Sequence, residues 1–354
     1  MRAQSCLQLL IACGLALGPP SPAVAQDAVA DFYKGKQMSI MVGFSPGGSS
    51  SLYAQALSRH MGRYLPGAPN FIIQHVPGAG GLVLANNIYN TVARDGTAFA
   101  ITGRTAAIEP LLGNANAKFD GRRFGWIGTA NVEYTTCTMW HTARVKTLAD
   151  AMTTEAIVGG SGADATEVVF PKAANKLVGT KFKIVMGYPT SPAVDLAMER
   201  GEVQARGGAS LAGMLQEHGD WIREKKIIAL VQVGSVREKD YPDLPLMHEL
   251  AKTPEQRQVL SLVSSPPSLG RPFLTTPDVP PERVAALKYA FAETMKDEAF
   301  LAEAKQLGLD MNPMTGEAVT QIVNDTINAP ADAITNAKVA IEPSGGSGGS
   351  KQGE

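Results

Sequence analysis

Residues Gly43 to Leu57 read GFSPGGSSSLYAQAL and predict, in this order, the end of a strand, a glycine turn and the first turns of a helix. Pro46 excludes helix before it, and Gly47 and Gly48 permit a tight turn with exposed backbone. The serines that follow are good N-cap residues. Free N–H groups and the dipole at such a helix start favour an anion, so the stretch predicts an anion-binding loop. An ordinary strand-to-helix loop with serine caps fits the same residues equally well.

The segment VPGAGGLVLANNI, Val76 to Ile88, repeats this pattern behind the apolar run FIIQH. A Pro-Gly-Ala-Gly-Gly turn again leads into a helix, about thirty residues after the first turn. Helix starts on successive parallel strands lie side by side at the carboxyl ends of those strands, where open α/β sheets bind ligands. The two loops together predict a cradle for a carboxylate.

Short apolar strands alternate with amphipathic helices along most of the chain, which predicts an α/β fold with mainly parallel sheets. The first series runs from Asp31 to about Trp140. A second series with its own turn signals begins near Leu148 and predicts a second domain. In the C-terminal third, LSLVSSPPSLGRPFL (Leu260 to Leu274) is expected to be extended, with helices after it.

The first 25 residues predict a signal peptide. Arg2 supplies the positive end, Leu9 to Leu17 is a short apolar core, and Ala23-Val24-Ala25 precedes an expected cleavage before Gln26. A lipoprotein signal ending at Cys13 is the alternative, although it leaves almost no apolar core before the cysteine. The mature protein is therefore expected to be exported.

Composition excludes several classes of partner and site. Removal of Arg2 with the signal peptide leaves 31 basic against 33 acidic residues, which argues against nucleic-acid or membrane-surface binding. Only Cys137 then remains, so no internal disulfide or cysteine-based zinc site is expected, and a buried thiol is the predicted role. His60, His141, His218 and His248 stand singly, so no metal site is expected either. The final residues, 343–354, predict a flexible tail.

The chain resembles a known family in the order of its motifs. GFSPGGSSS, then PGAGG, then ARDG before a strand ending in TG, and then GYPTSPAVDLAMERGEVQ (Gly187 to Gln204) are similar to segments of the Bug family, the periplasmic receptors of tripartite tricarboxylate transporters. REKDYPDLPLMHEL (Arg237 to Leu250), RPFLTTPDVPPERVAAL (Arg271 to Leu287) and LGLDMNPMTGEAV also fit the pattern. No single motif is specific, but the ordered set covers nearly the whole mature chain.

The resemblance implies a type II periplasmic binding protein, in which two α/β domains are joined by crossing strands and close over a ligand. Domain 1 would comprise residues 31–139 and 260–335, and domain 2 residues 140–259. The crossing strands would lie near Tyr134 to Trp140 and Leu260 to Leu269. The protein would be a monomer that binds a small carboxylic acid and hands it to membrane permease subunits, with no cofactor, no metal and no catalytic residue.

The resemblance also implies which residues contact the ligand. The first loop would bind a carboxylate through its backbone, with the hydroxyls of Ser49 and Ser50 as extra donors. The second loop would add backbone donors, the end of the third strand would close the floor, and two loops of the other domain would approach the far end of the ligand. These segments comprise Ser45, Pro46, Gly47, Gly48, Ser49, Ser50 and Ser51, then Gly78, Ala79, Gly80 and Gly81, then Thr102, Gly103 and Thr105, then Ser161, Gly162 and Ala163, and finally Tyr188, Pro189, Thr190 and Ser191.

Three departures from the family pattern bear on the substrate. Ser51 stands where many members carry an aspartate that suits a ligand ammonium, which argues against an amino acid. His75 stands in place of the usual asparagine before the second loop. Val168 and Val169 replace a polar contact early in the first helix of the second domain, so the far end of the pocket is expected to be less polar.

Two arginines are candidates for direct contact with a second carboxylate of the ligand. Arg104 follows the third strand, and Arg206 lies inside the strand-like VQARGG, an unusual place for an unpaired charge. A guanidinium binds a carboxylate in a bidentate manner. Alternatively, each arginine forms an ion pair with an acid such as Glu133 or Asp164, or points to solvent.

Two other functions are compatible with the residues. Ser161 follows a strand and precedes a helix, the context of a hydrolase nucleophile, with Asp195 or Asp243 and His218 or His248 downstream. The motif GGSGA lacks the final glycine of that pattern, which disfavours an enzyme. A sensor subunit that binds the same ligand and reports to a signalling partner fits the sequence as well as a transport receptor does.

Overall fold

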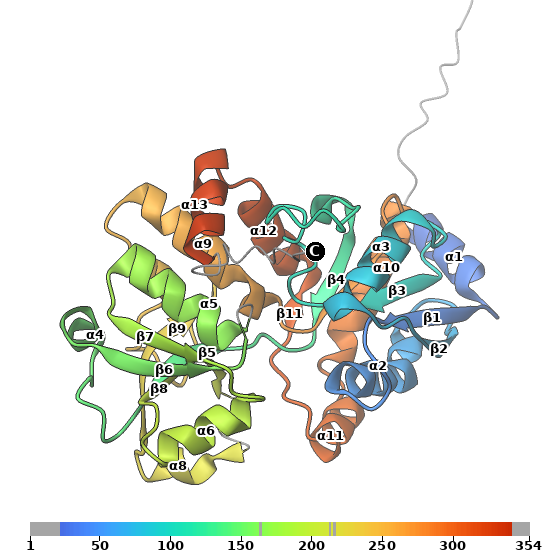
Figure 1. Cartoon of the computed structure of the whole chain (residues 1–354). Helices are drawn as coiled ribbons and strands as arrows, with labels where there is room; N and C mark the ends of the chain where they lie inside the picture. The colour runs from blue at the N-terminus through green and yellow to red at the C-terminus, as the bar shows by residue number, and fades with distance from the viewer. Residues whose placement is uncertain (1–21, 163–164, 212–213, 215–216, 342–354) are drawn as a thin grey trace, which may run out of the picture.

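The structure is a computed structural model that describes residues 22–162, 165–211, 214 and 217–341. Two lobes, each a β-sheet covered by helices, lie side by side (Figure 1). The predicted two-domain α/β fold class is therefore confirmed. The predicted signal peptide up to residue 21, and the predicted tail, lie outside the described residues.

The first lobe contains a six-stranded mixed sheet in the order β11-β4-β10-β3-β1-β2. β1 pairs in parallel with β2 and β3, as the alternation of strands and helices predicts, whereas β10 runs antiparallel between β3 and β4. The strands are β1 (Gln37–Val42), β2 (Asn70–His75), β3 (Ala98–Ile101), β4 (Gly125–Thr129), β10 (Pro272–Thr275) and β11 (Met314–Thr315).

The second lobe contains a five-stranded sheet in the order β7-β6-β8-β5-β9. β6 is parallel to β7 and β8, and β5 is antiparallel to both β8 and β9. The strands are β5 (Thr135–Trp140), β6 (Ala156–Gly160), β7 (Phe182–Met186), β8 (Ala205–Ser210) and β9 (Ile227–Val233).

Helices cover both sheets (Figure 1). Those of the first lobe are α1 (Pro22–Tyr33), α2 (Ser49–His60), α3 (Leu82–Asn90), α10 (Pro281–Thr294), α11 (Glu298–Gln306) and α12 (Gly316–Ile327). Those of the second lobe are α4 (Leu148–Thr153), α5 (Thr166–Ala173), α6 (Ser191–Glu199), α8 (Gly219–Arg223), α9 (Pro254–Leu269) and α13 (Ala331–Ile341).

Alternating residues of β1 face two separate cores, which explains why this strand is apolar along most of its length. Ile40 and Val42 are fully buried in the core that includes α2 and α10. Met41 points to the opposite face, where it packs in the core that contains Leu84 of α3 and Trp126 of β4. The sheet of the first lobe is therefore an inner layer covered by helices on both faces.

Both sheets turn the carboxyl ends of their parallel strands toward the hinge between the lobes. In the first lobe, β4 ends at Thr129, where the chain leaves the sheet for the second lobe, and Thr129 pairs with Pro272 of β10. The next residue of β10 pairs with Ile101, the end of β3. In the second lobe, β5 begins at Thr135, where the chain joins the second sheet, and Thr135 pairs with Ser210 at the end of β8. The two carboxyl edges therefore face each other across the hinge.

The two segments that connect the lobes are hydrogen-bonded to each other. The amide of Glu133 donates to the carbonyl of Pro267 at 3.0 Å, and the amide of Arg271 donates to the carbonyl of Asn131 at 3.2 Å. A Cβ at Gly270 would lie 1.6 Å from the Asn131 carbonyl oxygen. Only glycine therefore allows the connecting segments to pack this closely.

The prediction of an extended crossing strand at Leu260–Leu269 is wrong, because these residues form most of α9. The apolar side chains of α9 recur at helical spacing and pack against α13 and the second-lobe core. Pro266 has no N–H to donate within the helix. The hydroxyl of Ser265 donates instead to the carbonyl of Leu262 at 3.0 Å, so this carbonyl remains hydrogen-bonded.

Two segments predicted for domain 1 lie with the second lobe. β5 pairs with β8 and β9 along its whole length, so a boundary between residues 139 and 140 would cut this strand. α13 packs on α5 and α9, and Ala333 and Ala337 are buried in the second-lobe core, although the sequence places residues up to 335 in domain 1. The remainder of the domain division stays a prediction.

Asp297 connects the start of α11 to α2 and the turn that follows it. Its Oδ1 accepts the amide of Phe300 at 2.8 Å as an N-cap, and its Oδ2 accepts from Arg63 at 3.0 Å and from the Tyr64 hydroxyl. The Tyr64 hydrogen bond holds the pKa of Asp297 below its usual value. Because the folded-state pKa is the lower one, the carboxylate stabilises the fold above the unfolded-state value of about 4, and this contribution is lost as pH falls through the folded-state pKa.

We predict that Asp297→Ala lowers the free energy of unfolding by about 1–2 kcal/mol at neutral pH, because the helix loses its cap and Tyr64 and Arg63 lose an acceptor. Asp297→Asn keeps a capping oxygen and should lose less. Urea denaturation at pH 5 and pH 3 measures both. The difference between wild type and Asp297→Asn should narrow at the lower pH, and a constant difference would contradict the role of the charge.

Cys137 lies on β5 with 3% of its surface exposed, and burial raises the pKa of its thiol to about 11. The predicted buried thiol is therefore confirmed.

We predict that a thiol reagent at neutral pH labels Cys137 only when the second lobe unfolds, because in the folded protein the thiol is protonated and the reagent cannot reach it. Labelling should rise with urea in parallel with the loss of structure. Labelling of the folded protein at the rate of a free cysteine would contradict the assignment.

Candidate functional site

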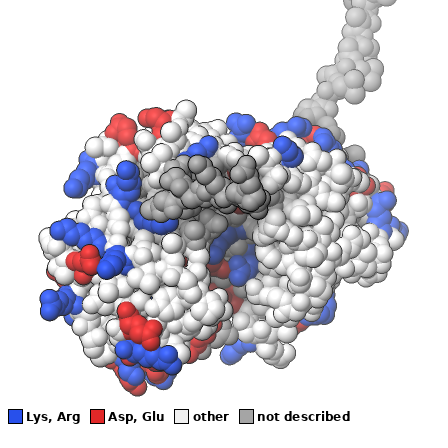
Figure 2. All heavy atoms as spheres, in the orientation of Figure 1, with Lys and Arg blue, Asp and Glu red and all other residues white. Residues whose placement is uncertain are grey.

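A cavity of about 400 Å³ lies at the carboxyl ends of β1 and β3, beside the hinge. Its walls come from the loop between β1 and α2, the second glycine loop, the segment after β3 and the two connecting segments. The lining residues are Phe44, Gly48, Ser49, Ser50, Gly80, Thr102, Gly103, Arg104, Thr105, Glu133, Gly270 and Arg271. Figure 2 shows the surface hollowed between the two lobes, with basic and acidic side chains inside the hollow.

The start of α2 forms a wall of the cavity and has no side-chain cap. Gly48 is the N-cap residue, and its carbonyl accepts the amides of Ser51 and Leu52 at 2.9 and 3.2 Å. The amides of the first two residues, Ser49 and Ser50, have no intrahelical acceptor, and the helix dipole adds partial positive charge at this end. This wall therefore suits an anion.

Ser51 supports the loop and does not line the cavity. It is fully buried, its hydroxyl oxygen accepts from the Gln55 amide at 3.2 Å, and it lies 3.4 Å from Nε2 of His75. The other ring nitrogen of His75 lies 2.9 Å from the carbonyl oxygen of Phe44. His75 thus holds the β1–α2 loop against the helix, and neither residue is among those that line the cavity.

The second glycine loop packs directly on the segment after β3. A Cβ at Gly103 would lie 2.2 Å from the carbonyl oxygen of Gly80, and a Cβ at Gly81 would lie 2.7 Å from the amide nitrogen of Gly103. Gly81 and Gly103 are therefore required by this contact. It places the backbone of Gly80 and Gly103 on the cavity wall.

Thr102 supplies a polar atom without a partner to the cavity wall. The residue is 1% exposed, and its hydroxyl oxygen has no hydrogen-bond partner among the described residues. A buried hydroxyl without a partner costs about 1–3 kcal/mol. A ligand that hydrogen-bonds to Thr102 would recover this cost on binding.

Two arginines and one glutamate form the charged side of the cavity. Glu133 accepts from Arg104 through Oε2 and from Arg271 through Oε1 at 2.6 Å, and Arg271 also reaches the Ser49 hydroxyl at 3.4 Å. The glutamate side chain is 12% exposed, whereas those of Arg104 and Arg271 are 30% and 26% exposed. The group carries one net positive charge and keeps guanidinium surface open to the cavity. The expected alternative of an Arg104–Glu133 ion pair is confirmed.

The second lobe carries a hydrogen-bonded cluster at its facing edge. Ser161, which follows β6, donates its amide and hydroxyl to Oε2 of Glu167 at 3.1 and 2.7 Å. Ser191, at the start of α6, donates its hydroxyl to Oε1. Arg206 of β8 lies 3.7 Å from Oε1 of Glu167 and donates to Asp195. Arg206 is therefore an ion-pair residue, as the alternative interpretation of the sequence expects.

The structure brings eight of the predicted contact residues together on the cavity wall. Those that line the cavity are Gly48, Ser49, Ser50, Gly80, Thr102, Gly103, Arg104 and Thr105. Those that do not line it are Ser45, Pro46, Gly47, Ser51, Gly78, Ala79 and Gly81 in the first lobe, and Ser161, Gly162, Tyr188, Pro189, Thr190, Ser191 and Arg206 in the second. Ala163 lies outside the described residues. A ligand contact for each of these residues stays a prediction.

Sequence reasoning missed Phe44, Arg271 and Glu167. The buried Glu167 lies beside Val168 and accepts from both Ser161 and Ser191, so the facing edge carries polar groups that the argument from Val168 and Val169 left out. The polarity of the far end of the pocket stays a prediction. An acid in the first turn of a helix that follows a glycine-rich loop is a signal that could have indicated Glu167. Nothing in the sequence near Arg271 indicates that it meets Glu133.

The geometry around Ser161 differs from that of a hydrolase. A serine nucleophile requires a base within hydrogen-bond reach. Ser161 donates its proton to the carboxylate of Glu167, and among the described residues it makes no hydrogen bond to the imidazole that the Ser-His-Asp pattern requires. His218 lies 3.4 Å from Asp195 and stacks on Trp221 with ring centroids 3.8 Å apart, so its partners are not the serine.

Asp195, Glu217 and His218 each place one potential ligand atom within 4.8 Å of the others. The interpretation of His218 as a histidine without ligand neighbours is therefore wrong. Arg206 already donates to one oxygen of Asp195, so that carboxylate has a counter-charge without an ion. The absence of a metal site stays a prediction.

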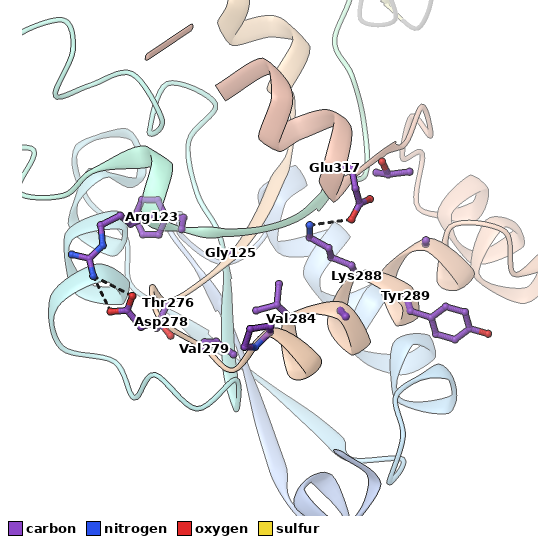
Figure 3. Close-up of a pocket in the computed structure, with 14 residues that line it drawn as sticks. Arg123, Gly125, Thr276, Asp278, Val279, Val284, Lys288, Tyr289 and Glu317 are labelled. Carbon is purple, nitrogen blue, oxygen red and sulfur yellow. Dashed lines mark hydrogen bonds and ion pairs between the residues drawn. The ribbon is translucent and has the colours of Figure 1, made fainter. Parts of the chain in front are cut away.

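A larger hollow of about 620 Å³ lies at the opposite edge of the first sheet (Figure 3). It surrounds Gly125 at the start of β4, away from the hinge. Its basic side chains are paired with acids, since Arg123 bonds Asp278 and Lys288 bonds Glu317 at 3.0 Å. Among its described lining residues, no basic side chain is left without an acidic partner.

Comparison with known proteins identifies the fold. The sequence matches no protein-family model and no curated protein. The structure is similar to that of a TctC solute-binding protein from Polaromonas, solved without ligand, with a TM-score of 0.67 and 19% identity over 87% of this chain and 99% of that chain. The chain has the fold of a TctC/Bug solute-binding protein.

The same binding-protein fold occurs in BugD, with a TM-score of 0.54 and 17% identity over 87% of this chain and 99% of that one. It also occurs in an R. palustris protein solved with adipate, with a TM-score of 0.54 and 17% identity over 86% and 98% of the two chains. The fold implied by the resemblance to the Bug family is confirmed. Within the described part of the chain, no helix is both long enough and apolar enough to cross a membrane.

We predict that Glu133→Gln lowers the free energy of unfolding by about 1–2 kcal/mol, because two partly buried guanidinium groups lose their shared counter-charge. Added sulfate should restore part of the loss. Glu317→Gln, which breaks the exposed Lys288 pair, is the matched control and should change stability by less than about 0.5 kcal/mol. Denaturation curves with and without the anion measure both variants. Equal losses without recovery by sulfate would contradict an anion-accepting role of the arginines.

Proposed function

We propose that this protein is a Bug-family receptor that captures a small organic carboxylate outside the cytoplasm and delivers it to a tripartite tricarboxylate-type permease. The observation that carries the proposal is the cavity beside the hinge. There an uncapped helix start, an unpartnered Thr102 hydroxyl and two guanidinium groups converge. Each of these groups hydrogen-bonds to or attracts a carboxylate.

The ligand would seat its carboxylate on the first lobe and be enclosed by the second. Among the described residues, those that line the cavity belong to the first lobe and the connecting segments, while the loops after β6 and β7 lie at the facing edge. Closure becomes favourable when a ligand supplies contacts to both lobes. We infer that the described arrangement corresponds to an open receptor.

The remaining parts of the proposal follow from the family resemblance. The protein would be exported by its signal peptide, act in the periplasm as a monomer and catalyse no reaction. Its fold neighbours include a protein described as a periplasmic binding protein and one solved with adipate, which supports a carboxylate ligand and a periplasmic site.

Gly48 is the best position to test the cavity. Its φ of −79° suits any residue, and the nearest atom to an added Cβ is the Ser45 carbonyl oxygen at 3.8 Å. Gly47 and Gly78 have φ of 87° and 146°, so substitutions there would strain the backbone. A side chain at Gly48 would occupy the cavity without disturbing the fold.

We predict that Gly48→Val weakens binding of a carboxylate ligand at least about tenfold, and that Gly48→Ala has a smaller effect in the same direction, because the added groups fill the seat in proportion to their size. Calorimetry against a panel of aliphatic and aromatic carboxylic acids identifies the ligand and measures both variants. Melting curves verify the fold. If the panel gives a ligand that both variants bind as tightly as wild type, the ligand carboxylate binds elsewhere than at the start of α2. If no carboxylate binds, the proposed function is wrong.

A further inference from the structure

At the facing edge of the second lobe, Ser161 and Ser191 donate their hydroxyl protons to the buried Glu167 and not toward the space between the lobes. The Glu167 carboxylate is 3% exposed, and a carboxylate paired with an arginine has only acceptor atoms. Ser161 donates its hydroxyl proton to Oε2 at 2.7 Å, and Ser191 donates its own to Oε1. Because each hydroxyl has one proton, both serines have only lone pairs left for a ligand.

Both serines stand where a ligand held in the cavity would meet the second lobe. Ser161 directly follows β6, Ser191 begins α6 after β7, and both side chains are partly exposed. These strands end at the edge where the chain arrives from the first lobe. The amide of Gly187 donates to the carbonyl of Gly160 at 3.2 Å, which keeps the starts of the two loops together.

The two facing edges carry charge of opposite sign. In the first lobe, two arginines share one glutamate, so one positive charge is left over. In the second lobe, Glu167 and Asp195 share Arg206, so this group of three has one negative charge left over when the neighbouring His218 is neutral. A second carboxylate at the far end of a ligand would meet lone pairs and excess negative charge. A hydroxyl or an ammonium group would meet matching acceptors.

We propose that the ligand carries a carboxylate at the end held by the first lobe and a hydrogen-bond donor, an ammonium or a hydroxyl group, at the end held by the second. The substrate is therefore an amino or hydroxy acid, and simple di- and tricarboxylates are disfavoured. This inference rests on the proposed function and narrows it. The sequence argument against an amino acid relies on Ser51, which is bonded inside the first lobe and does not line the cavity.

Glu167 is a positioning residue in this proposal, because it acts on the ligand through the serines. Replacement by glutamine leaves one oxygen to accept and turns the other position into a donor, so one serine proton becomes free to face the ligand. It also removes the excess negative charge. Arg206 retains Asp195 as its partner in such a variant. The variant should therefore change which ligands are preferred, which a purely structural role would not do.

Calorimetry with the mature protein tests the preference directly. The probes are a straight-chain monocarboxylic acid, its ω-hydroxy acid, its ω-amino acid and the dicarboxylic acid of equal length, at several chain lengths. At the best length, the hydroxy or amino acid should bind about tenfold or more tightly than the unsubstituted acid, and the dicarboxylic acid more weakly than both. A preference for the amino acid over the hydroxy acid would show that charge contributes as well as hydrogen bonding.

Two variants and one control locate the effect. Ser161→Ala should reduce the advantage of the donor ligand over the unsubstituted acid, and Glu167→Gln should reduce the discrimination against the dicarboxylic acid about tenfold. Glu224→Gln removes an acidic charge from the same lobe, at a position bonded to Lys226, and should leave the order of ligands unchanged. If Glu167→Gln fails to fold, Ser161→Ala still tests the acceptor edge.

The outcomes separate this inference from the proposed function. If the dicarboxylic acid binds most tightly, or if the four probes bind equally, the inference is wrong while the carboxylate receptor stands. If no probe and no other carboxylate binds, both are wrong.

Discussion

The course of β4 and β5 through the hinge fixes where this protein can hold a ligand. β4 leaves one sheet and β5 enters the other at edges where parallel strands end, so the two carboxyl edges are opposed. The start of α2 and the loops after β2 and β3 then lie on one side, and the loops after β6 and β7 lie on the other. Strand order alone therefore produces a site between the lobes, before any side chain is considered.

Side chains give the opposed edges their different chemistry. On the first lobe, Glu133 comes from one connecting segment and Arg271 from the other, so the charged wall of the cavity is built from the hinge itself. On the second lobe, Glu167 lies in the first turn of α5, where the helix dipole favours a carboxylate. Both acids pair with arginines, and the surplus charge of the two groups has opposite sign on the two sides. In the proposed function, the ligand would be bound by preorganised groups whose desolvation is already compensated in the fold.

Sequence reasoning predicted the local parts of this site and missed the tertiary ones. The glycine loops and the start of α2 were predictable, because turn and capping residues determine local backbone. The helix at Leu260–Leu269 was not, because burial of its apolar face against α13 and the Ser265 hydrogen bond outweigh two prolines. The Arg104–Glu133 pair was one of the expected alternatives, whereas Arg271 is distant in sequence from its partners. Periodicity carries no information about such distant side-chain contacts.

The bonds between the two connecting segments determine the mechanics of the protein. The amide of Glu133 is hydrogen-bonded to Pro267 and that of Arg271 to Asn131, and Gly270 packs directly against Asn131. We therefore expect the two connecting segments to act as a single hinge. A translation of one lobe past the other would break these hydrogen bonds, whereas a rotation about the hinge would preserve them. Arg271 and Glu133 at the hinge would then keep their positions during domain rotation. The charge proposed to attract the ligand would be the same in the open and closed forms.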